Sequence, residues 1–137
     1  MNPRLKYPFL FMLGGSFYNI IELTARGYTH WTMYLLGGLC FVLLGFIPRL
    51  LPGRPLMVHM LAGGALITLL ELAAGLILNI GLGWEVWDYS KRLLNFKGQI
   101  CLKHTTFWCL ITPVAILLND YLRYWLFGGQ KPRYRLL

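Results

Sequence analysis

Two glutamates inside apolar stretches are the residues best suited to chemistry. The chain holds only five acidic residues, and Glu22 and Glu71 both lie in long apolar runs. A carboxylate at the centre of a membrane helix costs about 2.5–3.5 kcal/mol on insertion scales, so such groups face a bundle interior or a wet cavity. We therefore expect Glu71, with Glu22, to bind a cation, a proton or a cationic substrate. Two simpler explanations stay open: a protonated Glu71 that joins two helices, and a local pair between Glu22 and Arg26.

The two glutamates occupy matching positions in the sequence. When the chain is shifted by 49 residues, segment 14–25 aligns with segment 63–74, and five of the twelve pairs are identical. The matches include a glycine pair and the glutamate at one offset. The pattern predicts a duplicated helical hairpin, with halves at about residues 7–51 and 56–127.

Helical spacing places each glutamate on a face with small and polar residues. Steps of three and four residues align side chains along one side of a helix, where small residues permit close packing and polar ones hydrogen-bond across the contact. We expect the two faces to meet each other or a shared centre, with Asn19 and Thr68 as further binding residues. The faces are Gly15, Asn19, Glu22 and Arg26 in the first half and Gly64, Thr68, Glu71 and Gly75 in the second; Gly38, Gly45, Gln99, Lys103 and Thr106 are expected to face them.

Composition assigns these helices to a membrane. The 137 residues are 57% hydrophobic and 13% charged, with a mean hydropathy of +0.55. Soluble domains are about 45–50% apolar and roughly 25% charged, which excludes a soluble enzyme, a zinc module or a nucleic-acid-binding domain. We predict an all-α polytopic membrane protein forming one domain over residues 1–137. Its four expected spans, arranged as two hairpins, lie at about Tyr7–Ala25, Trp31–Leu51, Leu56–Ile80 and Gln99–Phe127, and the first is a retained helix rather than a cleaved leader.

The basic residues predict the orientation. Eight fall on the side of the termini and five on the other, within a net charge of +8. The positive-inside rule then places both termini in the cytoplasm, and the basic tail 128–137 is expected to lie on anionic lipid. The eight are Arg4, Lys6, Arg49, Arg54, Arg123, Lys131, Arg133 and Arg135.

The long connection at about 81–98 is the expected place for functional non-helical structure. We expect Asp88, Tyr89, Asn95 and Gln99 to gate or line an outer entrance; an ordered cap without chemistry is the alternative. The string Trp87-Asp88-Tyr89-Ser90, then Asn95 and Gly98-Gln99-Ile100-Cys101-Leu102, resembles the signature of the ABC-transporter type IV family of small bacterial integral membrane proteins. The resemblance implies membrane transport and a bacterial plasma membrane.

Other signals are weak or absent. The sequence has no Gly-x-x-x-x-Gly-Lys loop, so an ATP-driven role would need other membrane or ATPase subunits as partners. Cys101 and His104 are spaced i,i+3, while His30 and His59 fall on opposite sides, and a metal site needs three or four converging ligands. We expect no metal, no cofactor and no nucleic acid.

Three functions remain open from the residues. The first is a small transporter or transporter subunit, expected as a homodimer because four helices enclose little volume. The second is an intramembrane enzyme acting on a lipid or isoprenoid. The third is a structural or sensory subunit whose polar residues only join helices.

Overall fold

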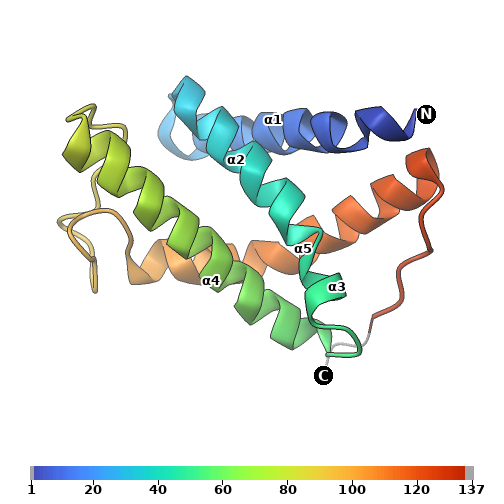
Figure 1. Ribbon diagram of the computed structural model, residues 1–137. Helices are drawn as coiled ribbons and strands as arrows, with labels where there is room; N and C mark the ends of the chain where they lie inside the picture. The colour runs from blue at the N-terminus through green and yellow to red at the C-terminus, as the bar shows by residue number, and fades with distance from the viewer. Residues whose placement is uncertain (1, 135–137) are drawn as a thin grey trace.

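The chain folds into helices that run lengthwise through the molecule (Figure 1). The structure is a computed structural model and describes residues 2–134. The elements are η1 (Pro3–Leu5), α1 (Lys6–Arg26), α2 (Trp31–Leu44), α3 (Ile47–Leu50), α4 (Leu56–Gly75), the π-helix η2 (Leu76–Gly81) and α5 (Leu102–Phe127). Within residues 2–134 the only β pairing is an isolated bridge between Phe96 and Ile100. The all-α prediction is confirmed.

Glycine and proline set the helix boundaries. Gly27 adopts a left-handed φ of +77° and its N–H donates to the Leu23 carbonyl at 3.0 Å, which ends α1. Gly128 ends α5 in the same way with φ +68°. The predicted single span Trp31–Leu51 is divided into α2 and α3, because Pro48 has no N–H to donate to the carbonyl of Leu44.

The first hairpin is held by reciprocal glycine contacts. A Cβ added to Gly15 of α1 would lie 2.6 Å from the Tyr34 carbonyl oxygen of α2, and one added to Gly38 would lie 2.6 Å from the Phe11 carbonyl oxygen. Any side chain at either position would therefore force the two backbones apart. Gly15 and Gly38 permit the close approach of α1 and α2.

The second hairpin has a matching glycine pair. Gly63 and Gly64 of α4 lie directly against Thr112 and Cys109 of α5. Gly45 packs against the Asn119 amide, and Gly75 against the Gln99 side chain. Gly15 of α1 therefore packs on α2 and Gly64 of α4 packs on α5, each within its own hairpin, whereas Gly45 and Gly63 lie at contacts between the two hairpins, against Asn119 and Leu44. The duplication itself stays a prediction.

Three helical segments of the described chain are long and apolar enough to cross a membrane. They are Trp31–Leu50, Leu56–Gly81 and Leu102–Phe127. The first expected span, carried by α1, is not among them; α1 contains Lys6, Glu22 and Arg26 in 21 residues. The predicted last span, at about Gln99–Phe127, is matched by α5, which begins at Leu102; Gln99 itself is buried in the preceding loop.

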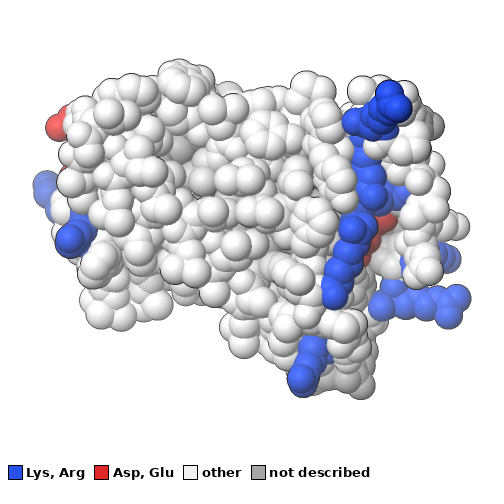
Figure 2. All heavy atoms as spheres, viewed as in Figure 1, with Lys and Arg blue, Asp and Glu red and all other residues white. Residues whose placement is uncertain are grey.

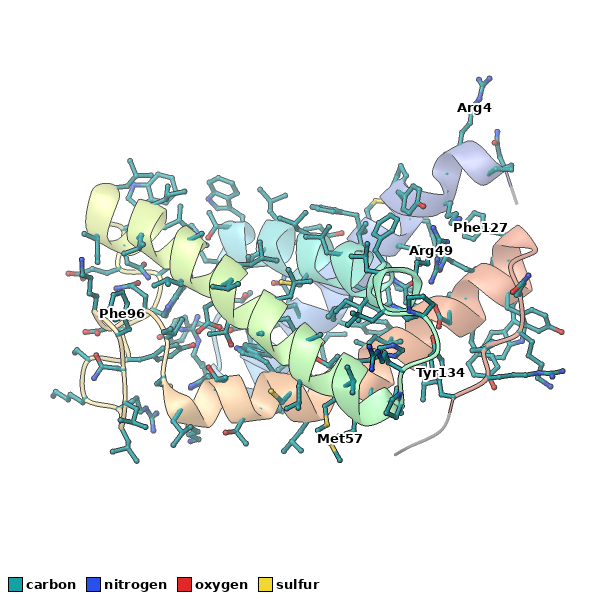
Figure 3. All side chains as sticks on the ribbon, turned by 60° about the horizontal axis from the view of Figure 1, so that its bottom comes forward. Arg4, Arg49, Met57, Phe96, Phe127 and Tyr134 are labelled. Carbon is teal, nitrogen blue, oxygen red and sulfur yellow. The ribbon has the colours of Figure 1, made fainter. Side chains whose placement is uncertain are left out.

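Charged groups gather at the two ends of the bundle. On the face seen in Figure 2, the Lys and Arg side chains of the described residues form a dense group at one end and a smaller one at the other. Lys6 and Tyr134 line one cavity, so the two ends of the described chain lie at the same end of the bundle. Figure 3 places Arg49, Phe127 and Tyr134 at that end and Phe96 at the other. The predicted tail residue Arg135 lies outside the described residues.

Candidate functional site

Glu71 lies in a buried contact between α4 and α5. Its side chain is 3% exposed, and its Oε2 accepts a hydrogen bond of 2.8 Å from Nε1 of Trp108, which is 5% exposed. The Trp108 ring stacks on Tyr18 of α1, with ring centroids 5.6 Å apart. Tyr18, Glu22, Arg26, Glu71 and Trp108 together are called the glutamate cluster below.

Glu22 enters the glutamate cluster as half of an ion pair. Arg26 Nε lies 2.6 Å from Glu22 Oε2, one helical turn away. The same guanidinium donates through Nη1 to the Val86 carbonyl at 3.3 Å and lies over the Tyr28 ring at 4.4 Å. Tyr18 lies one turn before Glu22 on α1 and stacks on Trp108, the donor to Glu71, so this ring connects the surroundings of the two carboxylates. The carboxylates thus share one polar neighbourhood, and each has its own partner.

Tyr89 brings the long loop to the glutamate cluster. Burial raises the pKa of Tyr89, and the nearby charges of Glu71 and then Glu22 raise it further. Its ring stacks on His104 at 4.3 Å, with the planes inclined by 16°. The charges of Glu71 and Glu22 thus act on a loop residue, and Tyr89 packs against the buried core that contains Tyr18 and Trp108.

The loop at 82–101, called the cap, is anchored into the end of the bundle. Asn79 of η2 accepts from the Val86 N–H at 2.7 Å and donates to Gln99 Oε1 at 2.8 Å. Trp87 Nε1 donates to the Gln99 carbonyl at 3.0 Å. Val86, Trp87, Gln99 and Cys101 are all buried. π-helical turns recur at functional sites, and here η2 supplies the residue that holds the cap.

Asp88 and Asn95 hold the shape of the cap. Asp88 is exposed, and its Oδ1 accepts from the Ser90 N–H at 2.9 Å; hydrogen bonds from Ser90 lower the pKa of this carboxyl. Asn95 donates to the Ser90 carbonyl at 3.1 Å and to the Arg92 carbonyl at 2.9 Å, and accepts from the Gly98 N–H at 3.0 Å. These side chains bond to loop backbone, away from the glutamate cluster.

Two further predicted residues also lie apart from the carboxylates. Asn19 accepts from the Thr29 hydroxyl at 3.1 Å, beside the connection between α1 and α2. Thr68 donates to Thr105 at 3.1 Å, about one turn before Glu71 on α4. Asn19 thus fastens a turn, whereas Thr68 lies on the same interhelical contact as Glu71.

Sequence reasoning missed the α5 residues that face α4. Lys103 and Thr106 were expected there, but both are exposed, and Thr105 and Trp108 make the contacts instead. Trp108 is 37 positions from Glu71, so no local spacing rule links them. Tyr18 lies one turn before Glu22 on α1, and that i,i+4 relation is a signal that was available in the sequence.

Cys101 and His104, at the junction of the cap and α5, contact each other: Cys101 Sγ lies 3.1 Å from His104 Nδ1. Within residues 2–134, no group of three His, Cys, Asp or Glu side chains could hold a metal ion.

The fold and site define a helical membrane protein with two carboxylates inside the bundle under an ordered cap. The family model described as "Putative ABC-transporter type IV" matches residues 8–128, and the chain belongs to this family. No curated protein and no solved structure matches the chain. The match covers α1 to α5 and the cap, and the family description indicates an ABC-transporter-related membrane protein.

Proposed function

We propose that the chain is a small transporter or transporter subunit that binds a cation, a proton or a cationic substrate at Glu71. The observation that carries the proposal is the buried carboxyl of Glu71 in the largely apolar helix α4. The charge of this carboxyl also raises the pKa of the cap residue Tyr89. Intramembrane carboxylates are costly to keep and mark ion or substrate pathways.

The surroundings of Glu71 suit a carboxyl that exchanges a bound proton for a bound cation, because both forms are neutral overall. Apolar surroundings tolerate a protonated carboxyl, or a carboxylate paired with a cation, far better than a bare charge. Thr68 and Thr105 supply hydroxyl oxygens on the same α4–α5 contact, and Trp108 holds one carboxylate oxygen in place. A cation that displaces the proton would therefore meet oxygen ligands already oriented toward the helix contact.

The cap would control access from its end of the bundle. Tyr89 packs against the core that contains Tyr18 and Trp108, and its position depends on the stacking with His104 and on the hydrogen bond from its N–H to the Gly98 carbonyl, 2.7 Å long. We infer four crossings, with α1 as the additional one. In support, Lys6 lies at the cavity end while Arg26 contacts Val86 of the cap. On this proposal the protein lies in the bacterial plasma membrane with both termini in the cytoplasm.

Reconstitution with a single substitution tests the proposal. In proteoliposomes with an internal pH-sensitive dye, we expect the wild type to exchange protons for at least one of Na⁺, K⁺ or ethidium. Glu71→Gln should abolish that exchange, because the amide cannot carry the charge but can still accept from Trp108. Glu85→Gln is the matched control, since Glu85 is exposed in the cap. Unchanged exchange in Glu71→Gln would contradict the role of this carboxyl.

A subunit whose polar groups only join helices is the second candidate. It is favoured by the internal partners of the carboxylates: Glu71 bonds to Trp108 across the α4–α5 contact, while Glu22 and Asp120 pair with Arg26 and Arg123 within their own helices. On this proposal the protein acts as a homodimer or with other membrane or ATPase subunits. Its mark would be a stoichiometric complex in detergent, together with a Glu71→Gln variant that keeps full activity in the cell.

A further inference from the structure

A strongly basic cavity lies at the opposite end of the bundle from the cap. Its volume is about 1100 Å³, at the upper limit of the roughly 300–1,000 Å³ of known small-molecule sites. One carboxylate, Asp120, is among its lining residues, and it already accepts hydrogen bonds from Arg123 and Tyr134. The basic side chains that line the cavity are Lys6, Arg49, Arg54, Arg123, Lys131 and Arg133.

Two buried nitrogens of the cavity wall have no partner among the described residues. His59 is 2% exposed; its Nε2 bonds to the Leu51 carbonyl at 2.9 Å, while Nδ1 is unpaired. Arg123 is 9% exposed; its Nη2 donates to the Gly45 carbonyl at 3.0 Å, while Nε is unpaired. Leaving a buried polar atom unpaired is destabilising, and the Arg123 Nε–H is therefore a donor available to a ligand in the cavity.

The C-terminal segment folds back along this cavity. Gly129 N–H donates to the Arg123 carbonyl at 3.0 Å, and the chain then turns back from the end of α5 (Figure 1). The Tyr134 ring packs edge-on against His59 with centroids 5.8 Å apart, and its hydroxyl donates to Asp120. These contacts fix Lys131 and Arg133 beside the basic residues of α1, α3 and the α3–α4 connection.

We propose that this cavity binds a phosphate group, carried by an anionic phospholipid headgroup or by a soluble phosphorylated compound. Arg presents several N–H donors in a fork that matches phosphate oxygens, and Lys adds a point charge. Exposed Arg49 and Arg54 provide the fork donors at the rim. Arg123 Nε is a buried donor that no described residue uses. The site is separate from the glutamate cluster and does not depend on it.

Two probes distinguish the sources of the phosphate. Pyrophosphate is titrated by calorimetry into protein held in phosphatidylcholine nanodiscs. Separately, retention of phosphatidylglycerol is measured by native mass spectrometry after reconstitution in a mixture with phosphatidylcholine. Pyrophosphate binding indicates a soluble ligand, and selective retention of phosphatidylglycerol indicates a lipid. Either result supports the phosphate site, and binding should weaken with added salt.

Matched double variants locate the binding. Arg49→Gln with Arg54→Gln should weaken binding at least about ten-fold, as expected from lost hydrogen bonds between charged groups. Lys91→Gln with Arg92→Gln removes the same charge from exposed residues of the cap and should leave binding unchanged. Arg49→Lys with Arg54→Lys keeps the charge and should give intermediate affinity, with an unchanged melting midpoint. The proposal is overturned if the wild type binds neither probe, or if the two Gln pairs weaken binding equally.

Discussion

The indole N–H of Trp108 donates to the carboxylate of Glu71 across the α4–α5 contact, at 2.8 Å and with both side chains almost fully buried. This bond fixes one carboxylate oxygen of the residue that carries the proposed function. It also joins the two longest helical segments near their cap ends. The predictions below begin with this pair.

Removal of the indole donor should destabilise the bundle. Trp108→Phe leaves a buried acceptor without its partner, which costs about 1–3 kcal/mol in the free energy of unfolding. Replacing both partners, with Glu71→Leu added, should recover most of that loss because no buried polar atom remains. Denaturant unfolding in micelles measures both. Trp125→Phe, at an exposed position, should change stability by less than about 0.5 kcal/mol, and an equal effect of the two Trp variants would refute the prediction.

The two glycine pairs should respond alike to added volume. Gly64→Leu forces a side chain into Cys109, and Gly15→Leu forces one into the Tyr34 backbone. Each should cost at least about 1–3 kcal/mol, the usual penalty for overpacking. Ala65→Leu is the control because Ala65 is exposed beside Gly64. Thermal melting in nanodiscs provides the measurement, and a Gly64→Leu protein as stable as Ala65→Leu would show that the contact is dispensable.

Loss of the Asn79 amide should release the cap. Asn79→Ala leaves the Val86 N–H and the Gln99 side chain without their buried partner, at about 1–3 kcal/mol for each group. We expect faster amide hydrogen exchange across residues 82–101 with little change in α1 and α2. Lys91→Ala, which alters an exposed side chain of the same loop, serves as the control. Exchange rates in Asn79→Ala that match the wild type would mean that the cap is held by other contacts.

The cap should loosen in acid through Asp88. Bonds from Ser90, with a smaller effect of Lys91, hold the pKa of Asp88 below the usual value of about 3.9. Its contribution to cap stability is therefore present above that value and is lost as the pH falls through the lower, folded-state pKa. Hydrogen exchange of residues 88–98 between pH 5 and pH 2 tests this. In Asp88→Asn the acid-dependent step should disappear; its persistence would assign the effect to another group.

The ends of α1 should lie on opposite sides of the membrane. Asn2→Cys and Tyr28→Cys place exposed thiols before and after this helix. In intact cells, a membrane-impermeant maleimide should label Tyr28→Cys, while Asn2→Cys should react only after permeabilisation. Lys91→Cys, in the cap, should behave like Tyr28→Cys. If Asn2→Cys and Tyr28→Cys were labelled from the same side, α1 would lie along the membrane surface.

Most of the helical plan could be predicted locally. Glycine at 27 and 128, and the apolar runs of α2, α4 and α5, follow from backbone conformation and hydrocarbon burial. The division of the second span at Pro48 was also available, because a proline removes one helical hydrogen bond. The start of α5 could not be predicted locally. Gln99 extends a helical pattern, but its amide is held by Asn79 and by the Lys97 carbonyl. A distant partner such as Asn79 overrides the local preference for helix.

The sequence by itself determined that this is an all-helical membrane protein with two unusual carboxylates, because composition and helical period are local properties. Only the tertiary structure decided what surrounds those carboxylates. Trp108 comes to Glu71 because Gly63 and Gly64 admit α5 closely, and Tyr89 reaches the glutamate cluster because Asn79 anchors the cap. The basic cavity likewise joins residues from both ends of the chain. Contacts between distant segments depend on packing, which no spacing along a single helix records.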